Sequence, residues 1–289
     1  MMTGKTLLVG LRADQFRHPL DLEATRALKQ LPGLDVMVRM ALAPLAERFF
    51  HLDHLASSLQ VSDRQLPDLH QSLVEACRIL DLEVPQLYVR QNPVPNAYTF
   101  AMRGEQPFIV IHTALIELLT PAETQAVIAH ELGHLKCEHS VYLTLANLIT
   151  MAASQLPLGE VLAQSLQNQL MEWVRCAEFT CDRAALLVVQ DPRVVASLLM
   201  KLCGGSPSLV DQLNVDAFID QARAYDSLSD DAIGEALKQV RTQGLTHPVP
   251  VLRAREIDRW ASTNDYYQLV KRPTVEYNED ASKGGWRNW

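Results

Sequence analysis

Three short apolar segments interrupt a chain whose hydrophobic pattern is otherwise mostly helical. Residues 86–90, 96–102 and 107–112 have the length and composition of β-strands, and residues 103–106 (Arg-Gly-Glu-Gln) form a turn signal between the last two. Residues 108–111 are apolar at every position, which predicts a strand in the interior of its sheet. The pattern therefore predicts an α+β fold that is predominantly helical and contains one small sheet.

Apolar residues recur at helical spacing through most of the remaining sequence. Two amphipathic helices are expected near the N-terminus, over 21–31 and 34–59, and another over 67–80. Helices then dominate from the last strand to about residue 261. Turn signals divide this region at Asp191-Pro192, Gly204-Gly205-Ser206-Pro207 and Thr246-His247-Pro248.

The best-defined helix contains the most informative motif. Thr120-Pro121-Ala122-Glu123 combines an N-cap, a proline at the first helical position and a glutamate that reaches back to the cap, and helix formers continue to Leu135. Inside this helix, His130-Glu131-Leu132-Gly133-His134 places two imidazoles one turn apart on one face. Such imidazoles can bind one metal ion, and Glu131 can act on a water molecule at that metal. The motif predicts a zinc hydrolase.

Two histidines require a third protein ligand, with a fourth position left for water. Ser140 stands where the motif of one class of zinc peptidases would place a third histidine, so the search moves downstream. Glu178 and Asp182 lie one turn apart in an apolar and helical stretch, 170–189. Glu178 can ligate the metal. Asp182 can accept the N–H on the far side of a ligand imidazole, for which His130 is the better partner.

These residues give the chain a resemblance to the M48 family of zinc metallopeptidases. The resemblance covers roughly 85–260, and Cys181 departs from it because alanine is usual at that position. The residues that show this resemblance are Asn96-Ala97-Tyr98, the His130–His134 motif with His139, residues 175–185 and Thr246-His247-Pro248. The resemblance implies a gluzincin-like core, in which a small antiparallel sheet lies beside the HExxH helix.

The resemblance also implies the roles of the central residues. His130, His134 and Glu178 would bind one Zn²⁺ per chain. Glu131 would be the general base and would pass its proton to the leaving amine. Asp182 would not bind the metal itself but would hydrogen-bond to one of its ligands.

Other residues receive roles at the edge of the same site. Asn96 and Ala97 would lie on an edge strand beside the cleft, where an extended polypeptide could pair its backbone. His247 would approach the metal and either stabilise the oxyanion or occupy the open coordination position, and both alternatives stay open. His139 is expected to be structural, because its spacing points it away from the zinc face.

Together these features predict a zinc-dependent endopeptidase that hydrolyses polypeptides, with a role in protein quality control. One alternative is a non-catalytic scaffold or chaperone-like binding protein with structural zinc, although such a site has no use for Glu131 beside an open position. A zinc enzyme that acts on a non-peptide bond would share every metal residue. The expected organisation is an N-terminal helical segment (1–66) that serves as lid, anchor or packing, a peptidase domain (67–262) and a C-terminal extension with a flexible end (263–289).

The composition narrows the partners and the location. A net charge of −8 over 289 residues argues against a nucleic-acid partner. The five cysteines are odd in number and lack CxxC spacing, which indicates reduced and buried thiols in the cytoplasm, and no N-terminal targeting signal is evident. Residues 140–159 carry no charge. They are expected either to continue the zinc-binding helix in the core or to make peripheral membrane contact.

Overall fold

The computed structural model describes residues 4–29, 56–101, 107–139, 159–227 and 248–271. It confirms an α+β fold that is mostly helical. In chain order, the elements are η1 (Ala13–Gln15), α1 (Pro19–Lys29), β1 (Leu59–Gln60), α3 (Pro67–Leu80), β2 (Gln86–Arg90), β3 (Ala97–Phe100), β4 (Phe108–His112), α4 (Thr113–Leu118), α5 (Pro121–Lys136), α7 (Gly159–Val189), α8 (Pro192–Gly204), η2 (Val210–Gln212), α9 (Val215–Ser227), α11 (Pro250–Ala261) and α12 (Asn264–Val270).

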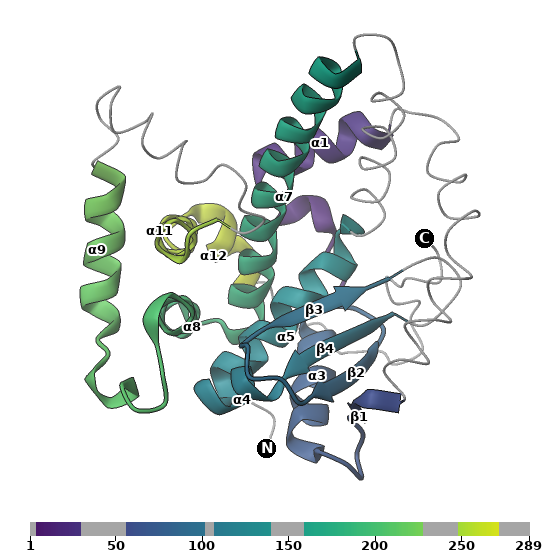
Figure 1. Cartoon of the computed structure of the whole chain (residues 1–289), viewed down its shortest axis with the longest axis vertical. Helices are drawn as coiled ribbons and strands as arrows, with labels where there is room; N and C mark the ends of the chain where they lie inside the picture. Colours follow the sequence, from purple (N-terminus) through teal and green to yellow (C-terminus); the bar gives the residue numbers. More distant parts are fainter. Residues whose placement is uncertain (1–3, 30–55, 102–106, 140–158, 228–247, 272–289) are drawn as a thin grey trace.

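The long helix α7 runs through the middle of the molecule (Figure 1). The sheet and α3 lie on one side of it, and α8, α9 and α11 lie on the other. Helix α5 contacts β3 and α3 as well as α7 and α8, so it connects the two sides. This central position places the HExxH motif deep in the molecule, next to both the sheet and α7.

The sheet is mixed, which corrects the expectation of an antiparallel sheet. Its strand order is β1-β2-β4-β3. Strands β2 and β4 pair in parallel, because the chain passes from β2 to the outer strand β3 before it returns antiparallel as β4. All five residues of β4 are buried, which confirms the predicted interior strand. Strand β1 was not predicted. It begins at Leu59, the last residue of a segment, 34–59, that was expected to be helical, and most of that segment lies outside the described residues.

Helix α5 begins as its sequence predicts. The Thr120 hydroxyl accepts from the Glu123 amide, and the Glu123 carboxylate accepts from the Thr120 amide at 2.7 Å. Nearly every residue from Glu123 to Leu135 is buried, so polar side chains on this helix need partners inside the protein. Glu123 finds one in Lys201 of α8, whose ammonium nitrogen lies 2.6 Å from the carboxylate.

Replacing Glu123 with glutamine is expected to lower the free energy of unfolding by about 3 kcal/mol at pH 7, because it leaves the Lys201 charge buried and unpaired. Burial raises the pKa of Glu123, but hydrogen bonds from Lys201, Ser197 and Thr120 outweigh it, so the pKa lies below its ordinary value. A lowered folded-state pKa contributes stability above the unfolded pKa of about 4.3, and this stability is lost as the pH falls through the folded value.

The loss caused by Glu123→Gln should therefore shrink in strongly acidic solution. Urea unfolding at neutral pH and below pH 4 measures both values. Asp216→Asn removes a surface pair with Arg193 and should change little at either pH. An equal loss from Glu123→Gln at both pH values would contradict the assignment.

The described N-terminal residues pack into the main core. Leu8, Leu11 and Phe16 are buried there, and α1 contacts α7. At the other end, α12 was not predicted, yet its Tyr266 and Leu269 belong to the same core. The uncharged stretch 140–159 lies outside the described residues except for its last position. Among the described helices, none combines the length and the apolar character needed to cross a bilayer.

Candidate metal centre

Helices α5 and α7 cross in close contact at Gly133. A Cβ atom built on Gly133 would lie 2.9 Å from the Ala184 Cβ and 3.0 Å from the Cys181 Cα. Glycine therefore permits an approach that any side chain would prevent. The crossing brings the two histidines of α5 opposite the acidic residues of α7.

Gly133→Ala is expected to destabilise the fold and to separate the two halves of the site. Alanine favours a helix over glycine by up to about 1 kcal/mol, but overpacking against a backbone atom costs about 1–3 kcal/mol. We expect a net loss of about 1–2 kcal/mol, measured by denaturant unfolding. Gly204→Ala in α8 is the matched control, because no atom lies within 4 Å of its added Cβ. A Gly133→Ala protein as stable as this control would contradict the packing argument.

Glu178 bridges the two histidines of the HExxH motif. Its Oε2 lies 3.3 Å from the His130 Nε2, and its Oε1 lies 3.3 Å from the His134 Nε2. His130 and Glu178 are buried, whereas His134 is partly exposed. Two imidazole nitrogens and one carboxylate thus meet at one point, and this donor set suits a divalent metal such as zinc.

Cys181 also lies close to the two histidines. One ligand-type atom from each of His130, His134 and Cys181 falls within 4.8 Å of the others. Burial raises the pKa of the Cys181 thiol well above its ordinary value, so the thiolate that a metal needs is disfavoured. Its sulfur lies 3.6 Å from the Nδ1 of His139. We therefore take Glu178, which reaches both Nε2 atoms, as the better third ligand.

Asp182 and Arg253 hold the other nitrogen of His130. The Asp182 Oδ1 lies 3.1 Å from the His130 Nδ1. Arg253 of α11 donates to both Asp182 oxygens, at 2.6 and 2.8 Å. Burial raises the pKa of Asp182, but Arg253 outweighs it and lowers the pKa overall. Burial lowers the pKa of His130, but Asp182 and Glu178 outweigh it and raise that pKa to about 10. Sequence reasoning missed Arg253.

His139 and Asp21 support His134 in a similar way to that in which Asp182 and Arg253 support His130. The Nδ1 atoms of His134 and His139 lie 3.1 Å apart, and the His139 Nε2 lies 3.1 Å from the Asp21 Oδ2. His139 was expected to be structural and to point away from the metal face; it contacts the Nδ1 of His134, whereas the Nε2 of His134 faces Glu178. Asp21, in α1, was not foreseen.

The remaining candidate residues have different positions. Glu131 is buried on α5 between the first histidine and Leu132. Asn96 immediately precedes β3 and its carbonyl accepts from the His112 amide, while Ala97 begins β3 and pairs with Ile111. Strand β3 contacts α5 and, among the described strands, forms one of the two edges of the sheet, with β1 at the other. His247 lies outside the described residues.

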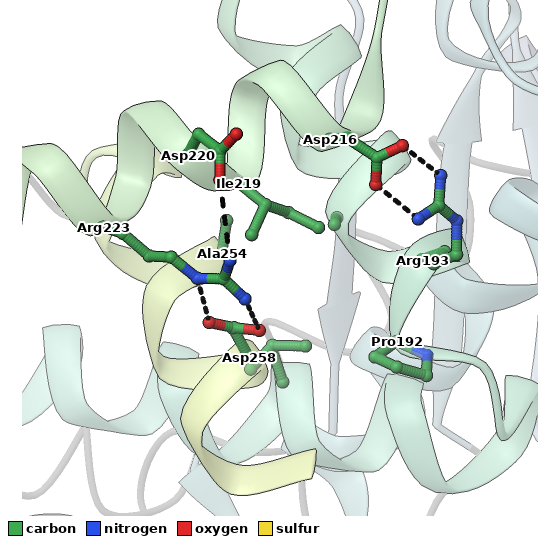
Figure 2. Close-up of a pocket in the computed structure, with 10 residues that line it drawn as sticks. Pro192, Arg193, Asp216, Ile219, Asp220, Arg223, Ala254 and Asp258 are labelled. Carbon is green, nitrogen blue, oxygen red and sulfur yellow. Dashed lines mark hydrogen bonds and ion pairs between the residues drawn. The ribbon is translucent and has the colours of Figure 1, made fainter. Parts of the chain in front are cut away.

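A separate hollow of about 260 Å³ lies between α8, α9 and α11 (Figure 2). Arg193 and Asp216 pair across its rim, and Arg223 pairs with Asp258, with a nitrogen–oxygen distance of 3.1 Å. None of the candidate metal ligands lines this hollow. Its charged side chains are all engaged in ion pairs with one another, so we assign it no catalytic role.

Comparison with known proteins identifies the family. A family model described as Peptidase family M48 matches residues 63–261, which is more than half of the chain. The chain belongs to peptidase family M48. This membership makes it a metallopeptidase, a hydrolase that depends on a metal ion, and it confirms the resemblance drawn from the motifs.

Several curated proteins are similar to this M48 peptidase. The "plastoglobule-localized metallopeptidase 48, chloroplastic" of Arabidopsis thaliana is 55% identical over 267 residues, 92% of this chain and 78% of the relative. "Protease HtpX homolog 2" of Methanosarcina mazei is 26% identical over 55% of this chain and 64% of its own, and the "Protease HtpX homolog" of Moorella thermoacetica is 28% identical over 50% and 58%. The chain thus spans about six tenths of these HtpX homologues.

The Arabidopsis relative is named as chloroplastic, so these relatives give no support to the expected cytoplasmic location. No solved structure matches the chain.

Proposed function

We propose that this M48 peptidase is a zinc-dependent endopeptidase whose metal is held by His130, His134 and Glu178. The proposal rests on the position of the Glu178 carboxylate between the two histidines. One of its oxygens lies 3.3 Å from the His130 Nε2, and the other lies 3.3 Å from the His134 Nε2. Three protein donors leave a fourth position of a tetrahedral ion for water or substrate, which is the pattern of a catalytic rather than a structural zinc site.

The donor set fits zinc. Neutral imidazole and carboxylate are ordinary zinc ligands, and a neighbouring carboxylate supports at least one of these imidazoles. When bound, zinc would act as a Lewis acid toward water and the scissile carbonyl. His247 is proposed to act near this ion in one of its two expected roles.

Glu131 is proposed to be the general base. It stands on α5 directly after His130, and it is buried, so its carboxylate acts where bulk water is largely excluded. In this role the Glu131 carboxylate accepts a proton from the attacking water and then donates it to the nitrogen of the leaving amine. Asp182, fixed by Arg253, keeps the His130 ring oriented throughout.

The substrate is proposed to be an extended polypeptide that adds a strand to β3. Ala97 begins this strand, which is one of the two edges of the described sheet and contacts the HExxH helix. Pairing at an edge strand uses backbone hydrogen bonds, which every polypeptide offers once it is unfolded. This mode favours unfolded chains over folded ones and supports a role in protein quality control.

The test uses the purified full chain with casein as an unfolded substrate and a compact native protein as the comparison. We expect cleavage of casein at internal bonds, identified by mass spectrometry of the fragments. A chelator should abolish it, and added zinc should restore it. Cleavage that persists in the chelator after the metal has been removed would overturn the metal-dependent mechanism. Release of terminal residues alone would overturn the endopeptidase assignment.

A further inference from the structure

Asp21 is a buried carboxylate surrounded by hydrogen-bond donors. It is fully buried, and Arg17 lies 3.3 Å from its Oδ1, where the indole N–H of Trp173 also donates at 3.0 Å. Its Oδ2 accepts from the Thr180 hydroxyl at 2.7 Å and lies 3.1 Å from the His139 Nε2. A carboxylate with donors on both oxygens and a cation beside it stays ionised, so it can only accept hydrogen bonds.

The acceptor-only character of Asp21 sets the direction of the hydrogen bonds beyond it. The nitrogen that faces it, the His139 Nε2, must carry a proton. A neutral imidazole then has a bare Nδ1, which can only accept. Among the described residues, the Nδ1 of His134 at 3.1 Å and the Cys181 thiol at 3.6 Å approach this nitrogen, and both can donate. His134 therefore carries its proton on Nδ1, and its Nε2 is left with a free electron pair.

For a neutral His139, the same contacts exclude the opposite direction. If His139 donated from Nδ1, its bare Nε2 would face the Asp21 carboxylate at 3.1 Å, with two acceptors in contact. His134 would then hold its proton on Nε2, the nitrogen that faces Glu178 and would have to ligate the metal.

From this geometry we infer that Asp21 is a positioning residue that acts through His139 to fix the tautomer and the aim of the metal ligand His134. The inference rests on the proposed function, because it assigns His134 to the metal. The hydrogen bonds from Asp21 through His139 to His134 would then correspond to the contact between Asp182 and His130. Asp21 lies in α1, ahead of the matched family region at 63–261, so the N-terminal segment completes the metal centre of the peptidase domain.

The first readout is the protonation state of His139 in the zinc-loaded wild-type protein. Long-range ¹H–¹⁵N spectra of ¹⁵N-labelled histidines distinguish the two tautomers. We expect His139 to carry its proton on Nε2, with nitrogen–nitrogen coupling across the hydrogen bond from His134. A proton on the His139 Nδ1 would overturn the inference, and this measurement needs no variant.

The second readout is zinc affinity, measured by competition with a chromophoric chelator. Changes to partners of a metal-binding histidine typically cost 10–100-fold in affinity. We expect Asp21→Asn to weaken zinc binding about tenfold. His139→Leu should bind zinc no more tightly than Asp21→Asn does. His139→Asn should recover part of the affinity, because an amide oxygen can accept from the His134 Nδ1. Thr25→Val is the matched control, since it removes a hydroxyl on the Oδ1 side of Asp21 and leaves the contact with His139.

The outcomes separate this inference from the proposed function. Wild-type affinity in Asp21→Asn, or equal affinities in the two His139 variants, would overturn the positioning role while the zinc site stands. A wild-type protein that binds no zinc would overturn the proposed metal centre itself.

Discussion

Glu131→Gln is expected to abolish peptide cleavage while the protein keeps its metal. Glutamine has nearly the same size and hydrogen-bonding reach, but it cannot accept a proton at neutral pH. General-base catalysis contributes about 10²–10⁴-fold, so we expect the rate of casein cleavage to fall by about a hundredfold to ten-thousandfold (~3–5 kcal/mol). Zinc stoichiometry should stay at the wild-type value, because Glu131 is not a proposed ligand.

The matched control for this variant is Glu117→Gln, on α4, whose side chain is exposed to solvent. It makes the same chemical change outside the site and should cleave casein at the wild-type rate. Glu131 would lose its assignment as general base if Glu131→Gln digested casein as fast as this control. Loss of zinc from Glu131→Gln would instead show that the residue supports the metal.

Glu178→Gln is expected to remove the metal. The change replaces the carboxylate that contacts both imidazoles, and an uncharged amide is a poor zinc ligand. The loss should exceed the 10–100-fold range that follows from changes outside the ligand shell. Elemental analysis after dialysis against a weak chelator should find zinc in the wild type and little in the variant. His134→Ala should behave in the same way.

Cys181→Ser provides the matched control on the same helix. Cys181 is three residues beyond Glu178 and also lies near the histidines, so this variant asks which of the two side chains binds the ion. We expect Cys181→Ser to keep full zinc content. The reverse pattern, with zinc lost from Cys181→Ser and kept in Glu178→Gln, would replace the proposed ligand set with one that contains sulfur.

The local elements were predictable because their signals are short-range. The capping residues Thr120 and Glu123 define the start of α5 without help from the rest of the fold. The continuous apolar run in β4 predicted a buried interior strand for the same reason. Pairing direction is different, because it depends on how the chain travels between β2 and β4. That route passes through β3, and no local pattern records it.

Asp182 was predicted behind His130, but Arg253 and Asp21 were missed, because both lie far in the sequence from the histidines that they support. Arg253 precedes Ile257 and Trp260 at helical spacing on a buried face of α11, so its position within an apolar stripe was a usable signal. Asp21 follows Arg17 by four residues, and this spacing indicates only an ordinary helical ion pair. Its contact with His139, 118 residues away, exists only in the folded protein.

X-ray absorption spectroscopy at the zinc edge of the purified protein tests the central claim most directly. The account predicts one zinc per chain, coordinated by nitrogen and oxygen atoms at about 2.0–2.2 Å, with two imidazoles resolved in the spectrum. A sulfur neighbour at about 2.3 Å, or a protein that takes up no zinc, would contradict the site formed by His130, His134 and Glu178.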